Sequence, residues 1–366
     1  MAASFPEDYA VVIGIEDYGQ LVPLPAATDD ASDFARWLME AGGLPDGNVK
    51  LLISPPEASA VVSDPAPILK HITDAWLSLK VGAALRRPPA QKRRIGRRLY
   101  FYFSGHGFGP HFDNVGMLLA DASSDILTRN MGLAPYRKFF HDHGLFDEIV
   151  YILDCCRDDS RGTLVQPPEF TNNPPNPLPP PAREFVVMAA RWGEKAFEAQ
   201  FAPGERRSGL LTKALLEGLG LDGAPKAVDV LDRVTTTSLW SWLQKRVPEL
   251  NARVGVGQTP EAEGSGRDEP MVLATFPLSP AQAVTLQVTL TMPLTSTLMV
   301  LMVMHDSTRA EKERLDLATL PAGQPWVVAL RPGFRYAVTH LDSGVSREFD
   351  LTNAAGGAAV PVNFPM

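Results

Sequence analysis

Two side chains suited to nucleophilic catalysis stand about 50 residues apart in a chain of 366 residues. His106 comes shortly after the apolar run 99–103, and Cys156 comes shortly after the apolar run 149–153. A thiolate attacks a carbonyl carbon while an imidazole takes and returns the proton, which is the pairing used in covalent acyl transfer. The residues therefore predict a nucleophilic pair, provided that the two runs are neighbouring strands.

The elements that must position this pair are visible in the hydrophobic pattern. Runs rich in β-branched and aromatic residues are typical of buried strands, and they alternate here with apolar residues at helical spacing. This alternation predicts an α/β fold, with a mostly parallel sheet flanked by helices. Parallel strands bring their carboxyl ends to one edge, where such sheets hold active sites. The expected strands are 9–15, 49–53, 99–103, 149–153 and 184–190, and the expected helices are 31–41, 65–85, 136–143, 210–219 and 228–247.

Each member of the pair also has an ordinary structural explanation. His106 alone could be a turn histidine, and Cys156 alone could be a small buried hydrophobe. Their joint occurrence at two strand ends favours the catalytic interpretation. The backbone N–H groups of Gly107 and Cys156 are the expected oxyanion donors, because glycine lets the backbone approach a substrate closely.

Composition and charge limit the class of protein. Hydrophobic residues make up 45% and charged residues 21%, as in ordinary globular proteins. The formal net charge of −8 argues against nucleic acid as a partner of the whole chain. The two cysteines are adjacent, so they form no disulfide framework and indicate a reducing compartment. No signal-like segment opens the chain, and a cytoplasmic protein without a membrane partner is expected.

The hydrophobic period changes after the polar, glycine-bearing stretch 261–270. Apolar residues then alternate with threonine and glutamine over 284–292, the two-residue period of a strand. A membrane span over 284–304 is disfavoured by these threonines, Gln287 and Pro293. The predicted domains are an α/β domain over 1–262, a linker over 263–275 and a small β-sandwich over 276–366, with further strands expected at 298–304, 326–330, 334–340 and 346–351.

Two motifs closely resemble those of the caspase-like cysteine peptidases, above all the prokaryotic caspase homologues, metacaspases and paracaspases. The histidine motif is Tyr102-Phe103-Ser104-Gly105-His106-Gly107, and the nucleophile motif is Leu153-Asp154-Cys155-Cys156-Arg157. The resemblance covers about residues 9–260 and implies a caspase-like peptidase domain over 1–262. It implies that Cys156 is the nucleophile, His106 its base and Cys155 a small spacer. The β-sandwich resembles, in architecture only, the immunoglobulin-like modules of some family members.

The nucleophile motif departs from that of caspases proper, which have Gln-Ala-Cys-Arg-Gly and need aspartate at the cleaved position. Asp154 stands here in place of the glutamine, and the resemblance implies that it lines the pocket for the first substrate side chain. Two further pocket acids are implied, Asp30 and Glu198, although Asp30 could be a helix N-cap and Glu198 a solvated acid. Three carboxylates would select a cation, and their acceptors favour arginine over lysine.

An arginine-cutting protease with exposed arginines is a plausible substrate of itself. The basic segment 86–98 could be a cleavable loop, a solvated connection or a nucleic-acid contact, although no aromatic residues interleave there to stack on bases. Family members are often inactive until a loop is cut or a partner binds. The expected partners are therefore protein substrates with exposed arginine and an activating protease or regulatory protein. The candidate processing sites are Arg86, Arg87, Arg93, Arg94, Arg97, Arg98, Arg161 and Arg183.

No cofactor is expected, and the histidines form no metal-binding pattern. Calcium dependence, common in metacaspases, is an alternative for which Asp113, Asp121, Asp125, Asp158 and Asp159 give no recognisable loop signature. The sequence predicts a cysteine endopeptidase that cleaves after arginine or lysine, in a bacterial defence or cell-death cascade. The alternative is a catalytically silent caspase-like module that binds basic segments.

Overall fold

The computed structural model divides the chain into two compact units, Met1–Ala227 with Val234–Ala274, and Val228–Arg233 with Thr275–Met366. The first unit therefore continues past the predicted boundary at residue 262. The structure describes residues 5–54, 65–86, 94–170, 174–175, 179–229, 232–264, 270–276, 284–290, 296–303, 312–320, 326–330, 335–341, 343–351, 354 and 357–364.

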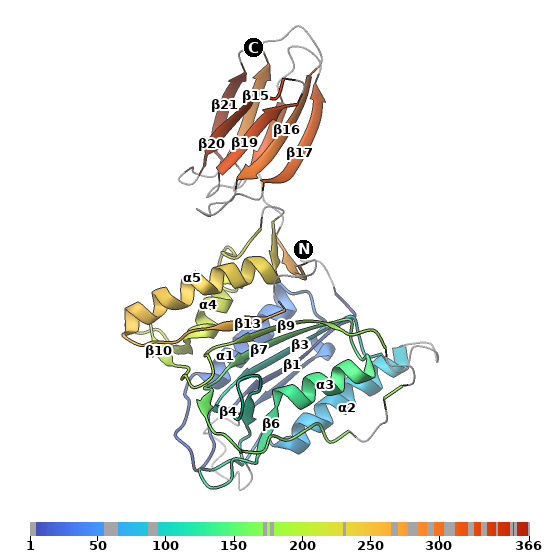
Figure 1. Cartoon of the computed structure of the whole chain (residues 1–366), viewed down its shortest axis with the longest axis vertical. Coiled ribbons are helices and arrows are strands. Elements are labelled where there is room, and N and C mark those ends of the chain that lie inside the picture. Colours follow the sequence, from blue (N-terminus) through green and yellow to red (C-terminus); the bar gives the residue numbers. More distant parts are fainter. Residues whose placement is uncertain are drawn as a thin grey trace. The chain divides into compact units, whose positions relative to one another are not determined.

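A six-stranded sheet in the order β13-β9-β7-β3-β1-β2 forms the centre of the first unit (Figure 1). Four neighbouring pairs run parallel, and only β13 runs antiparallel to its neighbour β9. This sheet confirms the predicted α/β fold. The three middle strands β1, β3 and β7 are buried at every residue, which explains their continuous apolar runs. The bounds are β1 (Asp8–Gly14), β2 (Val49–Ile53), β3 (Arg98–Ser104), β7 (Glu148–Asp154), β9 (Arg183–Met188) and β13 (Glu261–Glu263).

Helices cover both faces of this sheet. Successive residues of a strand point to opposite sides, so the apolar side chains on each side need helices to bury them. In β3, Phe101 lies 6.3 Å from Trp76 of α2 between ring centroids, whereas Tyr102 lies 4.8 Å from Phe34 of α1. Helix α3 packs on the side of α2, and α4 packs against α1 and α5. The bounds are α1 (Ala27–Glu40), α2 (Leu69–Arg86), α3 (Leu133–His143), α4 (Leu210–Leu219) and α5 (Thr236–Val254), with one 3₁₀ turn, η1 (Asp46–Asn48).

Helix α1 begins four residues earlier than predicted. Its N-cap is Ala26, and Asp29 and Asp30 lie within its first turn. The structural alternative of Asp30 as an N-cap is therefore wrong. The carboxylate of Asp30 is instead directed at residues far along the chain.

Short strands absent from the prediction lie around the ends of the sheet. Their length of two to four residues, with glycine in several of them, gives no periodic signal. One four-stranded sheet consists of β4 (Gly107–Gly109), β5 (Gly116–Leu118), β6 (Asn130–Gly132) and β8 (Asp158–Asp159). Two-stranded pairs are formed by β10 (Glu198–Gln200) with β11 (Arg207–Gly209), and by β12 (Arg233–Thr235) with β14 (Val272–Thr275).

The described part of the second unit consists of strands in two sheets. Strand β18 (Trp326–Leu330) alternates buried and exposed residues, as expected for a strand with one face in a core. Strands β17 and β21 were not predicted. The first sheet contains β18, β15 (Val284–Leu290) and β21 (Ala359–Phe364), and the second contains β17 (Lys312–Leu320), β16 (Ser296–Val303), β19 (Arg335–His340) and β20 (Ser346–Asp350). Among the described residues, no helix is long and apolar enough to cross a membrane.

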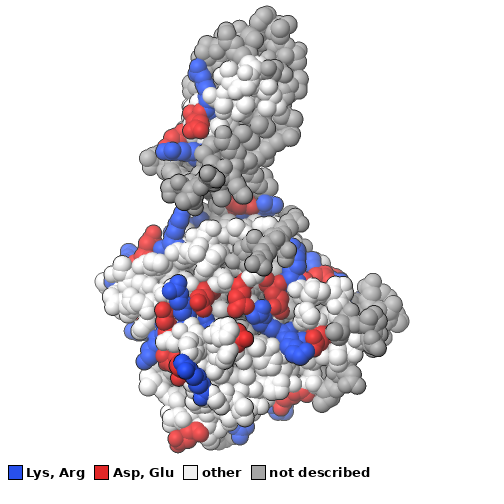
Figure 2. Space-filling view, in the orientation of Figure 1, with Lys and Arg blue, Asp and Glu red and all other residues white. Residues whose placement is uncertain are grey.

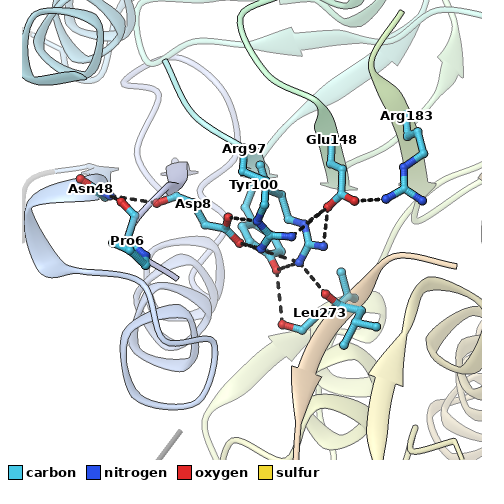
Figure 3. A network of polar contacts seen from close by, with 10 residues as sticks. Pro6, Asp8, Asn48, Arg97, Tyr100, Glu148, Arg183 and Leu273 are labelled. Carbon is cyan, nitrogen blue, oxygen red and sulfur yellow. Dashed lines mark hydrogen bonds and ion pairs between the residues drawn. The ribbon is translucent and has the colours of Figure 1, made fainter. Parts of the chain in front are cut away.

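A buried ion-pair network lies at the amino ends of the central strands (Figure 3). Asp8, Arg98 and Glu148 occupy paired register positions on β1, β3 and β7, so that opposite charges alternate across the sheet. The guanidinium of Arg98 is only 1% exposed and lies 2.5 Å from the Glu148 carboxylate. It also donates to the Val272 carbonyl at 2.6 Å. The network thereby ties β14 to the central sheet.

This network corrects the prediction that Arg98 belongs to an exposed, cleavable loop. Arg98 is the buried first residue of β3, and Arg97 donates to the Asp8 carboxylate at 2.8 Å. The reason is that Asp8 and Glu148 supply the carboxylates that a buried guanidinium needs. The candidate sites Arg87 and Arg93 lie outside the described residues. Arg86 ends α2, Arg94 pairs with Asp147, Arg161 is exposed and Arg183 begins β9 with an ion pair to Glu148.

Replacement of Arg98 by methionine should lower the free energy of unfolding of the first unit by about 3 kcal/mol, because it leaves buried carboxylates without their partner. Chemical denaturation followed by helical circular dichroism measures this unit, since all the described helices belong to it. The exposed Arg161, changed to methionine, is the control and should shift stability by less than about 0.5 kcal/mol. Equal effects of the two changes would show that the network is not stabilising.

Candidate active site

His106 and Cys156 line one pocket at the carboxyl edge of the central sheet. Ser104 of β3 is the register partner of Asp154 of β7, and each candidate residue lies two positions beyond its strand's partner. The parallel pairing of β3 with β7 therefore brings the imidazole and the thiol to the same edge. The pocket has a volume of about 70 Å³, and its other lining residues include Leu24, Ala196, Phe197, Glu198 and Gly209.

The imidazole of His106 is held through one ring nitrogen. Its Nε2 lies 2.7 Å from the carbonyl oxygen of Val22. A carbonyl can only accept, so Nε2 carries the hydrogen, and Nδ1 of the neutral ring is left as the acceptor. Burial lowers the pKa of His106, and the Val22 carbonyl acts in the opposite direction. The ring is therefore a neutral base near pH 7.

Tyr18 holds the turn that carries His106. Its buried hydroxyl accepts a hydrogen bond from the His106 N–H at 2.7 Å and donates to the Leu118 carbonyl at 3.4 Å. The Leu118 N–H in turn donates to the His106 carbonyl at 2.9 Å. The rings of Tyr18 and His106 are 4.8 Å apart between centroids. The sequence analysis missed Tyr18 and Val22, because only tertiary folding brings their loop onto the histidine.

Cys156 and Cys155 have different surroundings. The sulfur of Cys156 accepts from the Ala196 N–H at 3.4 Å and donates to the Ala196 carbonyl at 3.6 Å, and the residue is half-buried. Cys155 is only 2% exposed. A Cβ atom at Gly107 would lie 2.6 Å from the Cys155 sulfur, so the two positions need small residues. Both cysteines belong to the pocket lining, but Cys155 is buried against Gly107 whereas Cys156 is partly exposed.

The protonation of the Cys156 thiol follows from its burial. Burial raises the pKa of Cys156, and the hydrogen bond from the Ala196 N–H opposes this only in part. The resting site therefore contains a neutral thiol beside a neutral imidazole. A thiol in this state has to lose its proton before it can act as a nucleophile.

The two predicted oxyanion donors differ in their backbone environment. Gly107 begins β4 and is the register partner of Met117 in β5. The N–H of Cys156 has no hydrogen-bond acceptor among the residues that the structure describes. The Cys156 N–H is therefore available to a substrate oxygen.

Asp154 and Asp30 are brought together at the start of α4. One carboxylate oxygen of Asp154 accepts from the Thr212 N–H at 2.9 Å and from the Thr212 hydroxyl at 2.7 Å. Asp30 accepts from the Gly209 N–H at 2.8 Å and from the Ser208 hydroxyl at 2.7 Å. A Cβ atom at Gly209 would lie 2.3 Å from Asp154 and 3.2 Å from Asp30. Glycine at position 209 is what permits both carboxylates to approach this turn.

Glu198 completes a group of three carboxylates with Asp30 and Asp154. Asp154 and Glu198 line the pocket of His106 and Cys156, which we call the acidic pocket, and Asp30 lies against Gly209 next to Asp154. Burial raises the pKa of Asp154 to about 6, and burial with the charge of Asp154 raises the pKa of Glu198 to about 7. Burial and then Asp154 also raise the pKa of Asp30 well above its ordinary value. None of the three forms an ion pair with a lysine or arginine among the described residues. The group is therefore electrostatically suited to a cation from outside.

The segment that carries Ala196 and Glu198 is held by residues near the end of the first unit. The Phe197 N–H donates to Gln258 Oε1 at 2.8 Å, and the Thr259 N–H donates to the Glu194 carboxylate at 3.2 Å. Arg157 is buried beneath this segment, with an ion pair of 2.6 Å to Glu261. These contacts fix one wall of the pocket. Among the described residues, no group of three or more His, Cys, Asp or Glu side chains could hold a metal ion.

The fold, with a thiol and an imidazole at the carboxyl edge of its sheet, is that of a cysteine peptidase of the caspase type. Residues 7–252 match the family model described as caspase domain, and the chain belongs to this family. This confirms the resemblance seen in the two sequence motifs.

The known proteins that are similar to the chain include a curated protease and a solved caspase structure. A probable protease of a Desulfuromonadales bacterium is 29% identical over 275 residues, which cover 69% of this chain and 31% of that protein. The chain thus spans about a third of the length of this curated relative. The crystal structure of caspase-1 from Spodoptera frugiperda matches with a TM-score of 0.41 and 13% identity, over 74% of this chain and 93% of that one.

Proposed function

We propose that the protein is a cysteine endopeptidase that cleaves after arginine, with Cys156 as the nucleophile and His106 as its base. One observation carries this proposal: Cys156 and His106 line the same pocket as Asp154 and Glu198. The carboxylates of this pocket would bind a cationic side chain, and the reactive pair in the same pocket would then cleave the peptide next to that residue.

The chemistry follows from the hydrogen bonds of the resting site. Nδ1 of His106 takes the proton from the Cys156 sulfur as the sulfur bonds to the substrate carbonyl carbon. The Cys156 N–H stabilises the oxyanion, and the Val22 carbonyl stabilises the imidazolium. The imidazolium then gives its proton to the departing amine. Water, deprotonated by His106, hydrolyses the thioester and returns the proton to the sulfur.

The preference for arginine rests on the number and geometry of the acceptors. A guanidinium presents five N–H donors in a planar fork, whereas an ammonium is a compact point charge. Asp154 and Glu198 line the pocket, and Asp30 lies against Gly209 next to Asp154. Carboxylates arriving from β7, β10 and α1 offer acceptors in several directions, which favours arginine over lysine.

The preference for arginine should depend on pH, because two of the pocket acids have pKa values near 6 and 7. Arginine stays charged throughout, so its binding should strengthen as the carboxylates ionise between about pH 5 and 8. The ratio of kcat/KM for an arginine substrate to that for its neutral citrulline analogue should rise by about tenfold or more, the size of a charge-assisted contact. Because the same thiol attacks both substrates, the effect of its ionisation on the rate cancels in this ratio. A ratio that stays flat over this range would contradict the role of the acids.

We also propose that the chain processes itself at an exposed arginine. Arg161 follows the proposed nucleophile by five positions and has a side chain that is 72% exposed, whereas Arg94 is 38% exposed. Intact mass after incubation should show a cut for the wild-type chain and none for Cys156→Ala. Arg161→Gln should remove the cut at that site and leave the others. An active chain that stays uncut would exclude processing as the activating step.

The remaining expectations concern partners and context. Figure 2 shows lysine and arginine residues mixed with aspartate and glutamate residues on one face of the first unit, which is the pattern of an ordinary solvated surface rather than of a nucleic-acid site. Protein substrates with exposed arginine, a regulatory protein or activating protease, and a cytoplasmic defence or cell-death cascade remain part of the proposal. Neither nucleic acid nor a membrane is proposed as a partner.

An arginyl chloromethyl ketone tests the proposed activity directly, because such a reagent alkylates a nucleophile only after its side chain has entered the adjoining pocket. Peptide mapping should locate the label on Cys156, and Cys156→Ala should stay unlabelled. The aspartyl reagent is the matched control and should react far more slowly. Faster labelling by the aspartyl reagent would contradict the specificity, and a chain that resists both reagents would be the silent binding module.

A further inference from the structure

A second pocket of about 420 Å³ adjoins the acidic pocket through β11, and we call it the distal pocket. Arg207 and Ser208 line the distal pocket, whereas Gly209 lines the acidic pocket. Ser208 also donates its hydroxyl to Asp30, so it touches both sites. Since a strand rises by about 3.4 Å per residue, a substrate residue two or three positions from the arginine could reach the distal pocket.

The wall of the distal pocket is held in place by the backbone. Gly220 ends α4 in the left-handed region with a φ of 75°. The N–H groups of Lys226 and Ala227 then both donate to the Gly218 carbonyl, at 3.1 and 3.0 Å. These bonds fix the loop after α4 against the helix. The shape of the pocket is therefore set by the chain's own hydrogen bonds. The Gly218 carbonyl near the end of α4 already accepts two of them.

Two of its four cationic side chains, those of Lys226 and Arg207, are held by neutral groups, whereas Arg206 is paired with Asp29 and Asp33. The ammonium of Lys226 lies 5.9 Å from the centroid of the Trp242 ring. Arg207 donates to the Glu198 carbonyl at 2.8 Å. No ion pair joins either of them to a carboxylate among the described residues. Lys213 lies 5.9 Å from the ring of Phe201 and has one loose carboxylate contact, at 3.5 Å.

Three of the four acids that line the same pocket are paired with arginines, whereas the fourth, Glu205, is the carboxylate that Lys213 contacts at 3.5 Å. Asp33 lies 3.0 Å from Arg36 and also pairs with Arg206. Glu217 accepts two hydrogen bonds from Arg246, at 2.6 and 3.0 Å. Asp222 lies 3.4 Å from Arg36. Among the residues that the structure describes, the charged side chains of the distal pocket that form no ion pair are therefore those of Lys226 and Arg207, both cationic.

We propose that the distal pocket is a second substrate subsite, which takes an acidic side chain two or three residues from the cleaved arginine. This inference rests on the proposed function, because it assumes that the arginine occupies the acidic pocket. Lys213, Lys226 and Arg207 would contact the carboxylate. The substrates recognised best would then combine an arginine with a nearby aspartate or glutamate.

Fluorescence anisotropy on the full chain with Cys156→Ala tests the subsite without requiring catalysis. Labelled peptides carry one arginine, and aspartate or asparagine is placed at each of the three positions on either side. Aspartate should bind about fivefold more tightly than asparagine at one position two or three residues away, the size of a partly exposed charge pair. Adding Lys213→Gln with Lys226→Gln should abolish this ratio, whereas the exposed Lys245→Gln on α5 should preserve it.

Three results would overturn the proposed subsite. The first is equal affinity for aspartate and asparagine at every position, the second is an unchanged affinity ratio in the double variant, and the third is no binding of any peptide. Cleavage of the same peptides by the wild-type chain reports separately on the proposed function. If cleavage occurs after arginine without any effect of the acid, the subsite is wrong while the protease proposal stands. If cleavage occurs elsewhere, the protease proposal itself is wrong.

Discussion

Cys156→Ala is expected to lower peptide cleavage by about 10⁴-fold or more, the loss that follows removal of a covalent nucleophile. Cys155→Ala should retain activity within about tenfold, because this thiol is only 2% exposed and packs against Gly107. The two substitutions lie at adjacent positions, and each removes one sulfur atom. Kinetics on one arginine substrate, with circular dichroism to verify folding, distinguish them.

If Cys155→Ala abolished cleavage and Cys156→Ala did not, the nucleophile would be Cys155 and the proposed assignment would be wrong. Loss of activity in both variants would need a separate check, because removal of a buried side chain also lowers stability. Alkylation of the remaining thiol provides that check. In folded Cys155→Ala, Cys156 should still react with iodoacetamide, whereas Cys155 in the Cys156→Ala chain should stay protected by burial.

Asp154→Asn is expected to lower kcat/KM for an arginine substrate by about 10- to 100-fold, because a charge-assisted hydrogen bond contributes about 1.5–3 kcal/mol. The amide keeps the shape of the side chain and can still accept from Thr212 through its oxygen. What it removes is the central charge of the acidic pocket. Cleavage of a citrulline substrate should change little, so the ratio of the two rates measures the charge alone.

The exposed carboxylate of Asp159 offers a control near the same strand end. It pairs with Arg161 at 3.0 Å and is not part of the pocket lining. Asp159→Asn should leave the ratio of arginine to citrulline cleavage unchanged. If Asp154→Asn also leaves it unchanged, the cleaved side chain does not lie beside Asp154, and the specificity must arise elsewhere.

The placement of the candidate pair could be predicted because it depends on strand order. The apolar runs predicted that β3 and β7 are strands, and the observed parallel register of Ser104 with Asp154 then aligns His106 with Cys156. The position of Asp154 at the end of β7 could be predicted for the same reason, whereas its place in the pocket was implied only by resemblance. Asp30 and Glu198 were implied only by resemblance, since they reach the pocket from α1 and β10, far apart along the chain.

Other parts of the site could not be read from the sequence because their signal is tertiary. Tyr18 and the Val22 carbonyl act on His106 through a loop that has no motif of its own. Strands β10 and β11 are too short to show a period, although they hold Glu198 and Gly209. Arg98 was assigned to a basic loop, since the register that pairs it with Asp8 and Glu148 is a property of the folded sheet.

The most direct test is a substrate profile of the purified wild-type chain. A set of fluorogenic peptides that differ only in the residue at the cleaved position gives kcat/KM for each, with Cys156→Ala as the blank. Arginine should be preferred, with lysine second and aspartate near the blank, because the carboxylates of Asp154 and Glu198 line this pocket and Asp30 lies next to Asp154. A preference for aspartate over arginine would contradict the acidic pocket as the binding site for the cleaved side chain, and with it the proposed specificity.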